Sequence, residues 1–116
     1  MKFSSHLYFR TDGTLGHYPV ISVDNNGVII AIDESDRKAE TAHTRFFTGV
    51  IIPEVDITKI SWGSRDVFCA SLRQLVDAEH EIAIGKRPGL LLLNGFDLNE
   101  FCIDNIHNRL IVNKLV

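Results

Sequence analysis

Histidine and cysteine are the side chains of this sequence best suited to bind a metal ion or to act as nucleophiles. No histidine belongs to a His-x-His, His-x₃-His or His-Glu-x-x-His motif, and there is no Cys-x-x-Cys pair. Those spacings place two ligands on one face of a strand or helix, so the sequence predicts no local metal site and no cofactor. A metal site assembled from distant residues stays an alternative. The five histidines are His6, His17, His43, His80 and His107.

The two cysteines, Cys69 and Cys102, are each surrounded by apolar residues. A nucleophilic cysteine needs a neighbouring base and an electropositive, partly open setting, and neither segment supplies one. We therefore expect two buried, unreactive thiols. Two cysteines are also too few for a disulfide framework, which is typical of a reducing, cytoplasmic location. His80 stands near the end of a predicted helix, where we expect it to cap the C-terminus.

Two polar segments suggest ligand sites without the spacing that such sites require. Residues Gly85–Gly89 resemble a phosphate loop, but the Walker spacing is absent and Pro88 lacks a backbone N–H. Asp33, Glu34 and Asp36 offer oxygen ligands for Ca²⁺, yet the EF-hand spacing is missing. We expect the first segment to be a tight turn and the second to be a solvated surface.

Length and composition limit the classes of protein to consider. The chain has 116 residues, of which 45% are hydrophobic and 23% are charged, as in one globular domain. The net charge of −3 argues against nucleic-acid binding, which needs a basic face. Met1–Ser5 is followed by no signal-peptide core, and the longest apolar run, Leu90–Leu93, is too short to span a membrane. We expect no nucleic acid and no membrane among the partners.

The elements that must position any site begin with strands. Asn25-Asn26-Gly27 lies between two β-branched runs and predicts a hairpin, because Asn and Gly tolerate positive φ. Gly49 inside a later run predicts a bulge or a close approach, and Pro53 ends that run. The predicted strands of this half are Phe3–Arg10, Tyr18–Asp24, Val28–Ile32 and Phe46–Ile52.

The pattern changes to a helical one after Ser64, which is a suitable N-cap. A helix is predicted over residues 64–79, with its apolar face packed on the sheet. The uninterrupted leucines of Leu90–Leu93 predict a strand covered on both faces, and Leu98–Ile103 and Arg109–Val116 predict two more strands. The apolar face of the helix consists of Val67, Phe68, Leu72, Leu75 and Val76.

Two segments together resemble the amidohydrolases, metal-dependent hydrolases that include cytosine, guanine and aminofutalosine deaminases. Residues 24–32, DNNGVIIAI, followed by residues 48–53, TGVIIP, are similar to the opening hairpin of that family. Residues 81–93, EIAIGKRPGLLLL, are similar to the stretch after its last barrel helix, with the wording at 87–90 nearest to the aminofutalosine deaminase-like branch. The resemblance covers about Val20–Leu93 and implies the small composite β-domain of the family without its catalytic barrel.

The family's metal ligands are not matched in this chain. The resemblance places Lys59 and Ser61 where the family has its His-x-His pair, and Glu54 where it has a glycine. A protonated lysine cannot ligate Zn²⁺, and serine is a poor ligand. Two further histidines and an aspartate of the family lie in the barrel, which has no counterpart here. The resemblance therefore implies a protein with no catalytic residue and no metal site.

We accordingly predict a mainly β fold, a small β-sandwich or open barrel with one helix, in a single domain. Its parts are N-terminal strands (1–58), a bridge and helix that replace the barrel (59–80) and C-terminal strands (81–116). The leading hypothesis is a non-catalytic binding or assembly domain, expected to form a homodimer. The alternatives are a hydrolase subunit that completes a separate barrel in trans, and a small-molecule-binding module with its site between sheet and helix. Trp62 either covers the core or joins Leu91 and Leu93 in an interface.

Overall fold

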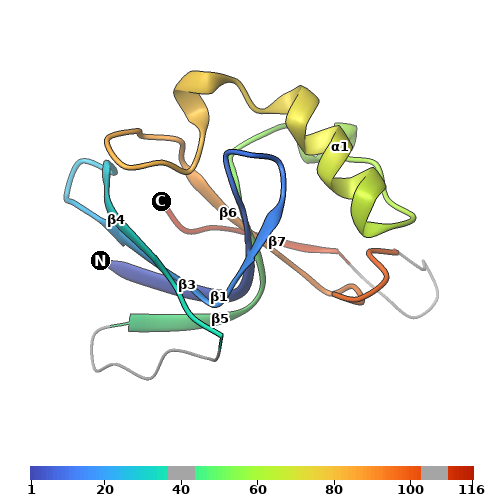
Figure 1. Cartoon of the computed structure of the whole chain (residues 1–116), viewed down its shortest axis with the longest axis horizontal. Helices are drawn as coiled ribbons and strands as arrows, with labels where there is room; N and C mark the ends of the chain where they lie inside the picture. Colours follow the sequence, from blue (N-terminus) through green and yellow to red (C-terminus); the bar gives the residue numbers. More distant parts are fainter. Residues whose placement is uncertain (37–43, 103–109) are drawn as a thin grey trace.

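Seven strands form one sheet in the computed structural model, which describes residues 1–36, 44–102 and 110–116 (Figure 1). Their order across the sheet is β4-β3-β1-β5-β6-β7. β3 pairs with the first half of β1, and the short β2 pairs with the second half. Only β1 and β5 run parallel among these pairs. The predicted mainly β fold with one helix is confirmed. The strands are β1 (Lys2–Phe9), β2 (Leu15–His17), β3 (Pro19–Val23), β4 (Ile29–Glu34), β5 (Thr44–Pro53), β6 (Leu90–Asn94) and β7 (Ile111–Lys114).

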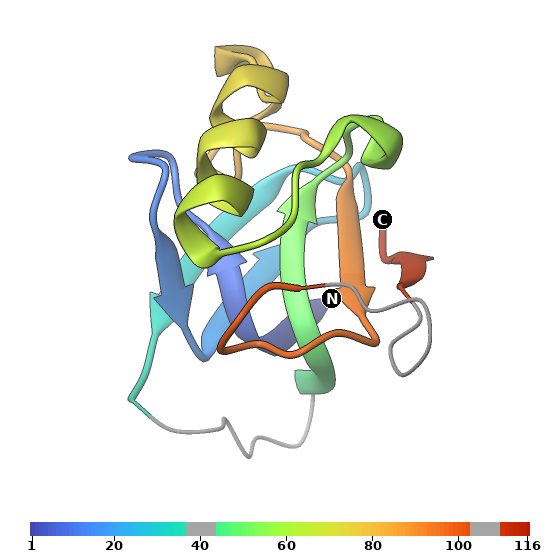
Figure 2. The same cartoon turned by 90° about the vertical axis from the view of Figure 1, so that its right-hand side faces the viewer.

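Each face of the sheet carries its own hydrophobic cluster. The helix α1 (Arg65–Leu75) covers one face, where Phe68 and Leu72 are buried (Figure 2). Along β6 the leucines alternate: Leu91 and Leu93 face the helix, and Leu90 and Leu92 face the opposite, inner cluster. A strand buried on both faces must be apolar throughout, which explains the uninterrupted leucines.

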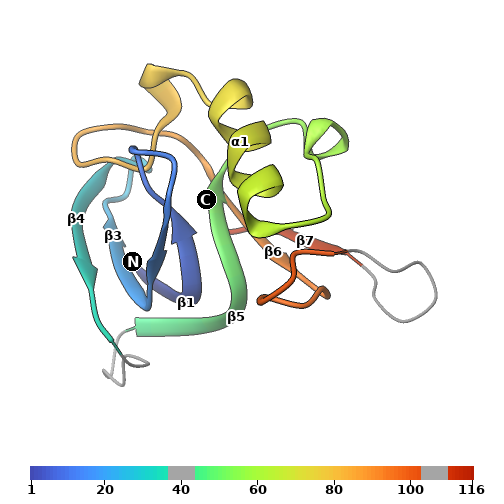
Figure 3. The same cartoon turned by 45° about the vertical axis from the view of Figure 1, so that its right-hand side comes forward.

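The inner cluster is enclosed because the sheet curls and a loop bridges its open side. Backbone hydrogen bonds join Ile29 of β4 to Gly85 (2.8 Å) and to Lys86 (2.9 Å). Val116 lies close to Gly27, so the far ends of the sheet approach each other there. The sequence predicts either a β-sandwich or an open barrel, and a single curled sheet corresponds to the open barrel. Figure 3 shows the 81–89 loop above β3 and β4.

The hairpin between β3 and β4 is confirmed, with a loop one residue longer than a two-residue turn. Asp24 N–H donates to the Val28 carbonyl (3.0 Å), and the Asp24 carboxylate accepts from Asn26 N and Val28 N. Gly27 alone in this loop has a positive φ, of 82°. This is the common three-residue loop that ends on a left-handed glycine.

The helix starts where predicted and ends earlier. Ser64 Oγ accepts from Val67 N (3.1 Å) as an N-cap, whereas the last residue is Leu75 rather than Glu79. Asp77 opens a separate 3₁₀ turn (Ala78–His80), and its carboxylate binds the N–H groups of that turn. Val67, assigned to the packed face, is 43% exposed. No helix in the described part of the chain is long and apolar enough to cross a membrane.

The prediction of a strand over Leu98–Ile103 is wrong for the residues described. The Asp97 carboxylate accepts from Asn99 N and Glu100 N, which holds residues 97–100 in a turn. Phe101 then adopts a φ of 52°, which is incompatible with a strand. Residues 103–109 lie outside the described part, and the last strand starts at Ile111 rather than Arg109.

Candidate binding site

Three cavities share Arg10 in their lining, at the end of the curled sheet where β1 turns into β2. Their volumes are about 90, 420 and 790 Å³. The second, which we name the Arg10 cleft, opens between the inner side of β4 and the 81–89 loop. Its polar lining residues are Tyr8, Arg10, Asp12 and Glu34, and its apolar lining, which we call the apolar wall, consists of Ile32, Ile82, Ala83 and Ile84.

A tight turn fixes Arg10 in this position. Arg10 N–H donates to the Thr14 carbonyl (2.8 Å), and Gly13 N–H donates to the Arg10 carbonyl (3.1 Å). The Asp12 carboxylate accepts from both Thr14 N (2.9 Å) and Thr14 Oγ1 (2.6 Å). Gly13 has a φ of 84°, a conformation that glycine adopts without strain. This turn therefore serves to present Arg10.

Glu34, at the end of β4, pairs with Arg10 across the cleft. Arg10 Nε (3.1 Å) and Nη2 (2.5 Å) both donate to Glu34 Oε1, and Nη1 donates to Thr14 Oγ1 (3.2 Å). Both side chains of the ion pair are more than one-third exposed. The hydrogen bonds to the guanidinium lower the pKa of Glu34 below its ordinary value, although partial burial opposes this. The pair is ionised at neutral pH.

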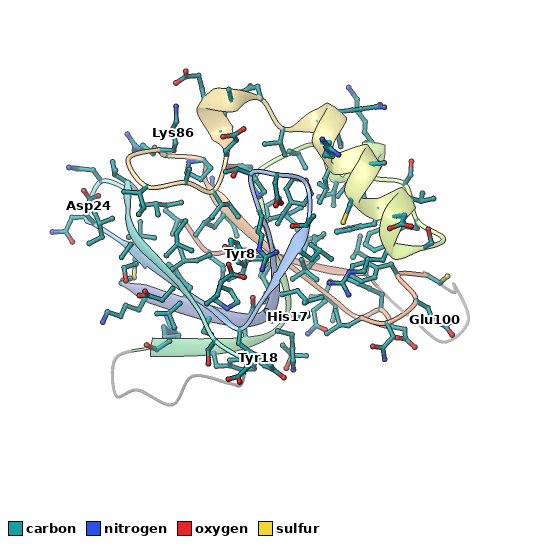
Figure 4. The ribbon with its side chains drawn as sticks, in the orientation of Figure 1. Tyr8, His17, Tyr18, Asp24, Lys86 and Glu100 are labelled. Atoms are coloured by element: carbon teal, nitrogen blue, oxygen red, sulfur yellow. The ribbon has the colours of Figure 1, made fainter. Side chains whose placement is uncertain are left out.

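Tyr8 forms the buried end of the cleft. It points to the inner side of the sheet, near the centre of the molecule in Figure 4, and is 5% exposed. Burial raises the pKa of Tyr8, the Glu34 carboxylate raises it further, and Arg10 acts in the opposite direction. Tyr8 is therefore a neutral hydroxyl that can both donate and accept a hydrogen bond.

Gly16, opposite Tyr8 in the β1–β2 pair, leaves the space that these side chains occupy. A Cβ atom on Gly16 would collide with the Tyr8 ring and with Glu34 Oε1, and would lie 2.9 Å from Arg10 Nε. The site thus depends on a residue without a side chain.

The smallest cavity connects this site to the helix. Arg73 of α1 lines it together with Arg10, Glu81 and Ile82. The Arg73 side chain lies against the Gly13 turn, where a Cβ would be 2.8 Å or less from its carbons. This cavity is a space between sheet and helix, which is where the sequence analysis placed its small-molecule alternative.

The residues singled out from the sequence lie elsewhere. Lys59 and Ser61 are exposed, after the end of β5. Trp62 is half-buried, and its ring centroid lies 5.1 Å from that of Phe68 and 4.8 Å from that of Phe96. Trp62 therefore covers the core.

The prediction that Leu91 and Leu93 line an interface needs correction. They are 7% and 0% exposed, because α1 and the residues around it already cover them. Buried within their own chain, the two leucines present no surface to a second one.

The cysteines are half-buried rather than fully buried. Burial raises the pKa of Cys69, as expected of an unreactive thiol. Cys102 Sγ lies 3.3 Å from the Gly63 carbonyl oxygen.

The described histidines have separate surroundings. His80 lies in the 3₁₀ turn, with Nδ1 2.7 Å from Asp77 Oδ1, so it does not cap α1. His6 Nδ1 accepts from Gly49 N (3.2 Å). Within residues 1–36, 44–102 and 110–116, no three His, Cys, Asp or Glu side chains gather as metal ligands. His43 and His107 lie outside the described residues.

The sequence analysis did not identify the Arg10 cleft. From the sequence, Tyr8 and Arg10 belong only to the predicted strand Phe3–Arg10, and Glu34 is expected to be a solvated charge or a Ca²⁺ ligand. The available signal was that Tyr8 and Arg10 are two residues apart, so that both lie on one face before a turn. Glu34 is 24 residues further along and gave no local signal.

Comparisons with protein families, curated proteins and solved structures find no match to this chain.

Proposed function

We propose that this protein is a non-catalytic binding domain, related to the small β-domain of amidohydrolases, and that it binds a small polar molecule in the Arg10 cleft. The observation that carries the proposal is the Arg10–Glu34 ion pair: Arg10 lines all three cavities, and Glu34 lines the two larger ones. Concave sites with an apolar wall and a few converging polar groups are the usual form of a small-molecule site.

The proposed ancestry rests on the two segments that resemble the family. Residues 24–32 and 48–53 contribute to β4 and β5, and residues 81–93 lead into β6, so both segments belong to one sheet. Only residues 54–89 connect β5 to β6, and Lys59 and Ser61 in that connection lack the ligand chemistry of the family's histidines. These features favour a domain that keeps the family's β-structure without its catalytic site.

Binding can be tested with a fragment library and two-dimensional NMR of the labelled protein. We expect fragments that bind to shift the amide signals of Gly16, Glu34 and Ile84 in a saturable way. Arg10→Gln should abolish those shifts. Arg65→Gln, which removes an exposed arginine at the start of α1 outside the cleft, should leave them unchanged. Equal binding to both variants, or shifts confined to another surface, would contradict the proposal.

Self-association is a second candidate, supported by a different observation. Ile30 and Ile84 are 56% and 65% exposed, and they neighbour the backbone bonds that join Ile29 to Gly85 and Lys86. Among the described residues β3 is the only strand that pairs with β4, and the 81–89 loop bonds the β4 edge at Ile29, so this aliphatic patch lies beside that edge. Exposed edges with apolar side chains favour pairing with another chain.

Sedimentation equilibrium tests this candidate. We expect the protein to be a dimer and Ile30→Lys to make it a monomer, because a lysine on the edge would have to be buried in the interface. Val67→Lys provides the matched control, since Val67 is an exposed aliphatic residue on α1. A monomeric unmutated protein would exclude self-association and leave the binding proposal intact.

A further inference from the structure

The charges around the Arg10 cleft and the smaller cavity beside it are mixed. Arg10 and Arg73 supply two cationic groups. Asp12, Glu34 and Glu81 supply three anionic groups. A simple anion would meet carboxylates here, and a simple cation would meet guanidinium groups. A molecule with both charges is complementary to such a site.

The Arg10–Glu34 pair sets the distance between those two charges. Arg10 Nη2 and Glu34 Oε1 are 2.5 Å apart, so a cationic and an anionic group lie directly side by side. Hydrogen bonds to Glu34 and Thr14 use three of the five N–H groups of Arg10, and the Tyr8 hydroxyl also interacts with the guanidinium. A carboxylate suits the planar guanidinium, and an ammonium suits the adjacent carboxylate. The ligand's charges must then be close neighbours, as they are when both groups are attached to one carbon.

The apolar wall determines the chemistry of the uncharged part of the ligand. Ile32, Ile82 and Ala83 are partly or fully buried, while Ile84 at the rim is 65% exposed. An aliphatic side chain laid on this wall would remove apolar surface from water, which is favourable. The cleft of about 420 Å³ falls within the range of roughly 300–1,000 Å³ that is common for small-molecule sites.

We infer that the Arg10 cleft binds a free α-amino acid with a branched aliphatic side chain, such as leucine. The α-carboxylate would accept hydrogen bonds from Arg10, the α-ammonium would donate to Glu34, and the side chain would lie against Ala83 and Ile84. This inference rests on the proposed function, because it names the ligand of the same cleft.

The experiment compares L-leucine with three analogues, each of which lacks one of its features. 4-Methylpentanoate lacks the ammonium group, 3-methylbutylamine lacks the carboxylate and glycine lacks the side chain. By calorimetry and NMR titration we expect leucine to bind, and each analogue to bind about tenfold more weakly or not at all, which corresponds to about 1.4 kcal/mol or more. Leucine and 4-methylpentanoate binding equally would overturn the inferred class.

Variants locate the binding. Glu34→Gln should weaken leucine and 3-methylbutylamine more than 4-methylpentanoate, because only an ammonium needs the carboxylate. Ile84→Ser alters an exposed side chain and should keep the fold. It should weaken leucine severalfold without affecting glycine, and Val67→Ser serves as its control. Leucine binding that is insensitive to both Glu34→Gln and Ile84→Ser would overturn the inference.

The inference and the proposed function fail in different ways. If leucine does not bind but other fragments shift Gly16, Glu34 and Ile84, the ligand class is wrong and the binding function stands. If no fragment and no amino acid binds the cleft, both are wrong.

Discussion

At the level of single residues, the site is organised by contacts around Arg10. Glu34 and Thr14 accept its hydrogen bonds, and the Tyr8 hydroxyl contributes to the same network. Each partner comes from a different part of the chain: Tyr8 from β1, Thr14 from the turn and Glu34 from β4. Such a network restricts the guanidinium to one orientation, which is the condition for selective binding.

Gly16→Ala should disturb this network. The added methyl group would collide with Tyr8 and Glu34, so we expect a loss of about 1–3 kcal/mol in the free energy of unfolding. Urea denaturation measures this loss. In a Tyr8→Ala background the ring is absent and the loss should be smaller; an equal loss in both backgrounds would show that the ring contact is not its cause.

The pKa of Glu34 predicts a dependence of stability on pH. Because the folded-state pKa is lowered below the ordinary 4.5, Glu34 stabilises the fold above that pH and loses its contribution as the pH falls through the folded-state pKa. Solvent screening limits the contribution of so exposed a pair to about 0.2–1 kcal/mol. Glu34→Gln should therefore be less stable than the unmutated protein at pH 7, and the difference should disappear as the pH falls below the folded-state pKa. The exposed Glu100→Gln, measured in parallel, controls for the removal of a surface carboxylate.

At the level of the elements, the parallel pairing of β1 and β5 is interrupted by a bulge. Their register shifts between Ser5 and Leu7, and the His6 side chain lies there with Nδ1 accepting from Gly49 N. Gly49 has a φ of 130°, and a Cβ atom there would collide with the Leu93 carbonyl oxygen of β6. The predicted close approach at Gly49 is thus real, and a side chain from β1 satisfies the N–H group that the bulge leaves unpaired.

Replacing His6 tests this arrangement. His6→Ala should lower the free energy of unfolding by about 1–3 kcal/mol, because it leaves a part-buried N–H group without an acceptor. His6→Asn places an oxygen near the position of Nδ1 and should recover part of the loss. Denaturation and hydrogen exchange of the Gly49 amide measure both effects; an asparagine variant as unstable as the alanine variant would contradict the assignment.

The start of α1 provides a second test at this level. Ser64→Ala should cost about 1 kcal/mol in thermal or urea unfolding, because the N-cap hydrogen bond to Val67 N is lost. Ser61→Ala, in the exposed segment before the cap, should be neutral within about 0.5 kcal/mol. Equal effects of the two substitutions would show that the cap does not stabilise the helix.

At the level of the whole molecule, one sheet separates and couples two hydrophobic clusters. Leu92 belongs to the inner cluster and Leu93 to the helix-side cluster, although they are neighbours on β6. Neither cluster can be lost while the sheet stays intact, because β1, β5 and β6 each contribute side chains to both.

We therefore expect a single cooperative unfolding transition. Leu92→Ala and Leu93→Ala should each destabilise the protein by about 2–5 kcal/mol. Fluorescence of Trp62, the only tryptophan, reports on the helix-side cluster, and far-ultraviolet circular dichroism reports on the sheet. The two signals should coincide in both variants. A Leu92→Ala protein in which they separate would show that the clusters unfold independently.

The sequence by itself determined the features that depend on neighbours along the chain. The β3–β4 hairpin follows from Asn25–Gly27, the start of α1 from Ser64 and the doubly buried β6 from Leu90–Leu93. It misjudged the places where local signals compete: Asp77 ends the helix early by capping a new turn, and Asp97 turns a segment that its apolar residues favoured as a strand.

Only the tertiary structure decided what lies at the site. The curl of the sheet brings Glu34 of the edge strand to Arg10, and the returning loop adds Ile82 and Ile84 to the opposite wall. It also assigned Leu91 and Leu93 to the core by placing α1 over them. The physical reason is that residue type and local spacing fix turns, caps and the face on which a side chain lies, whereas the meeting of distant side chains depends on how the whole sheet curls and packs.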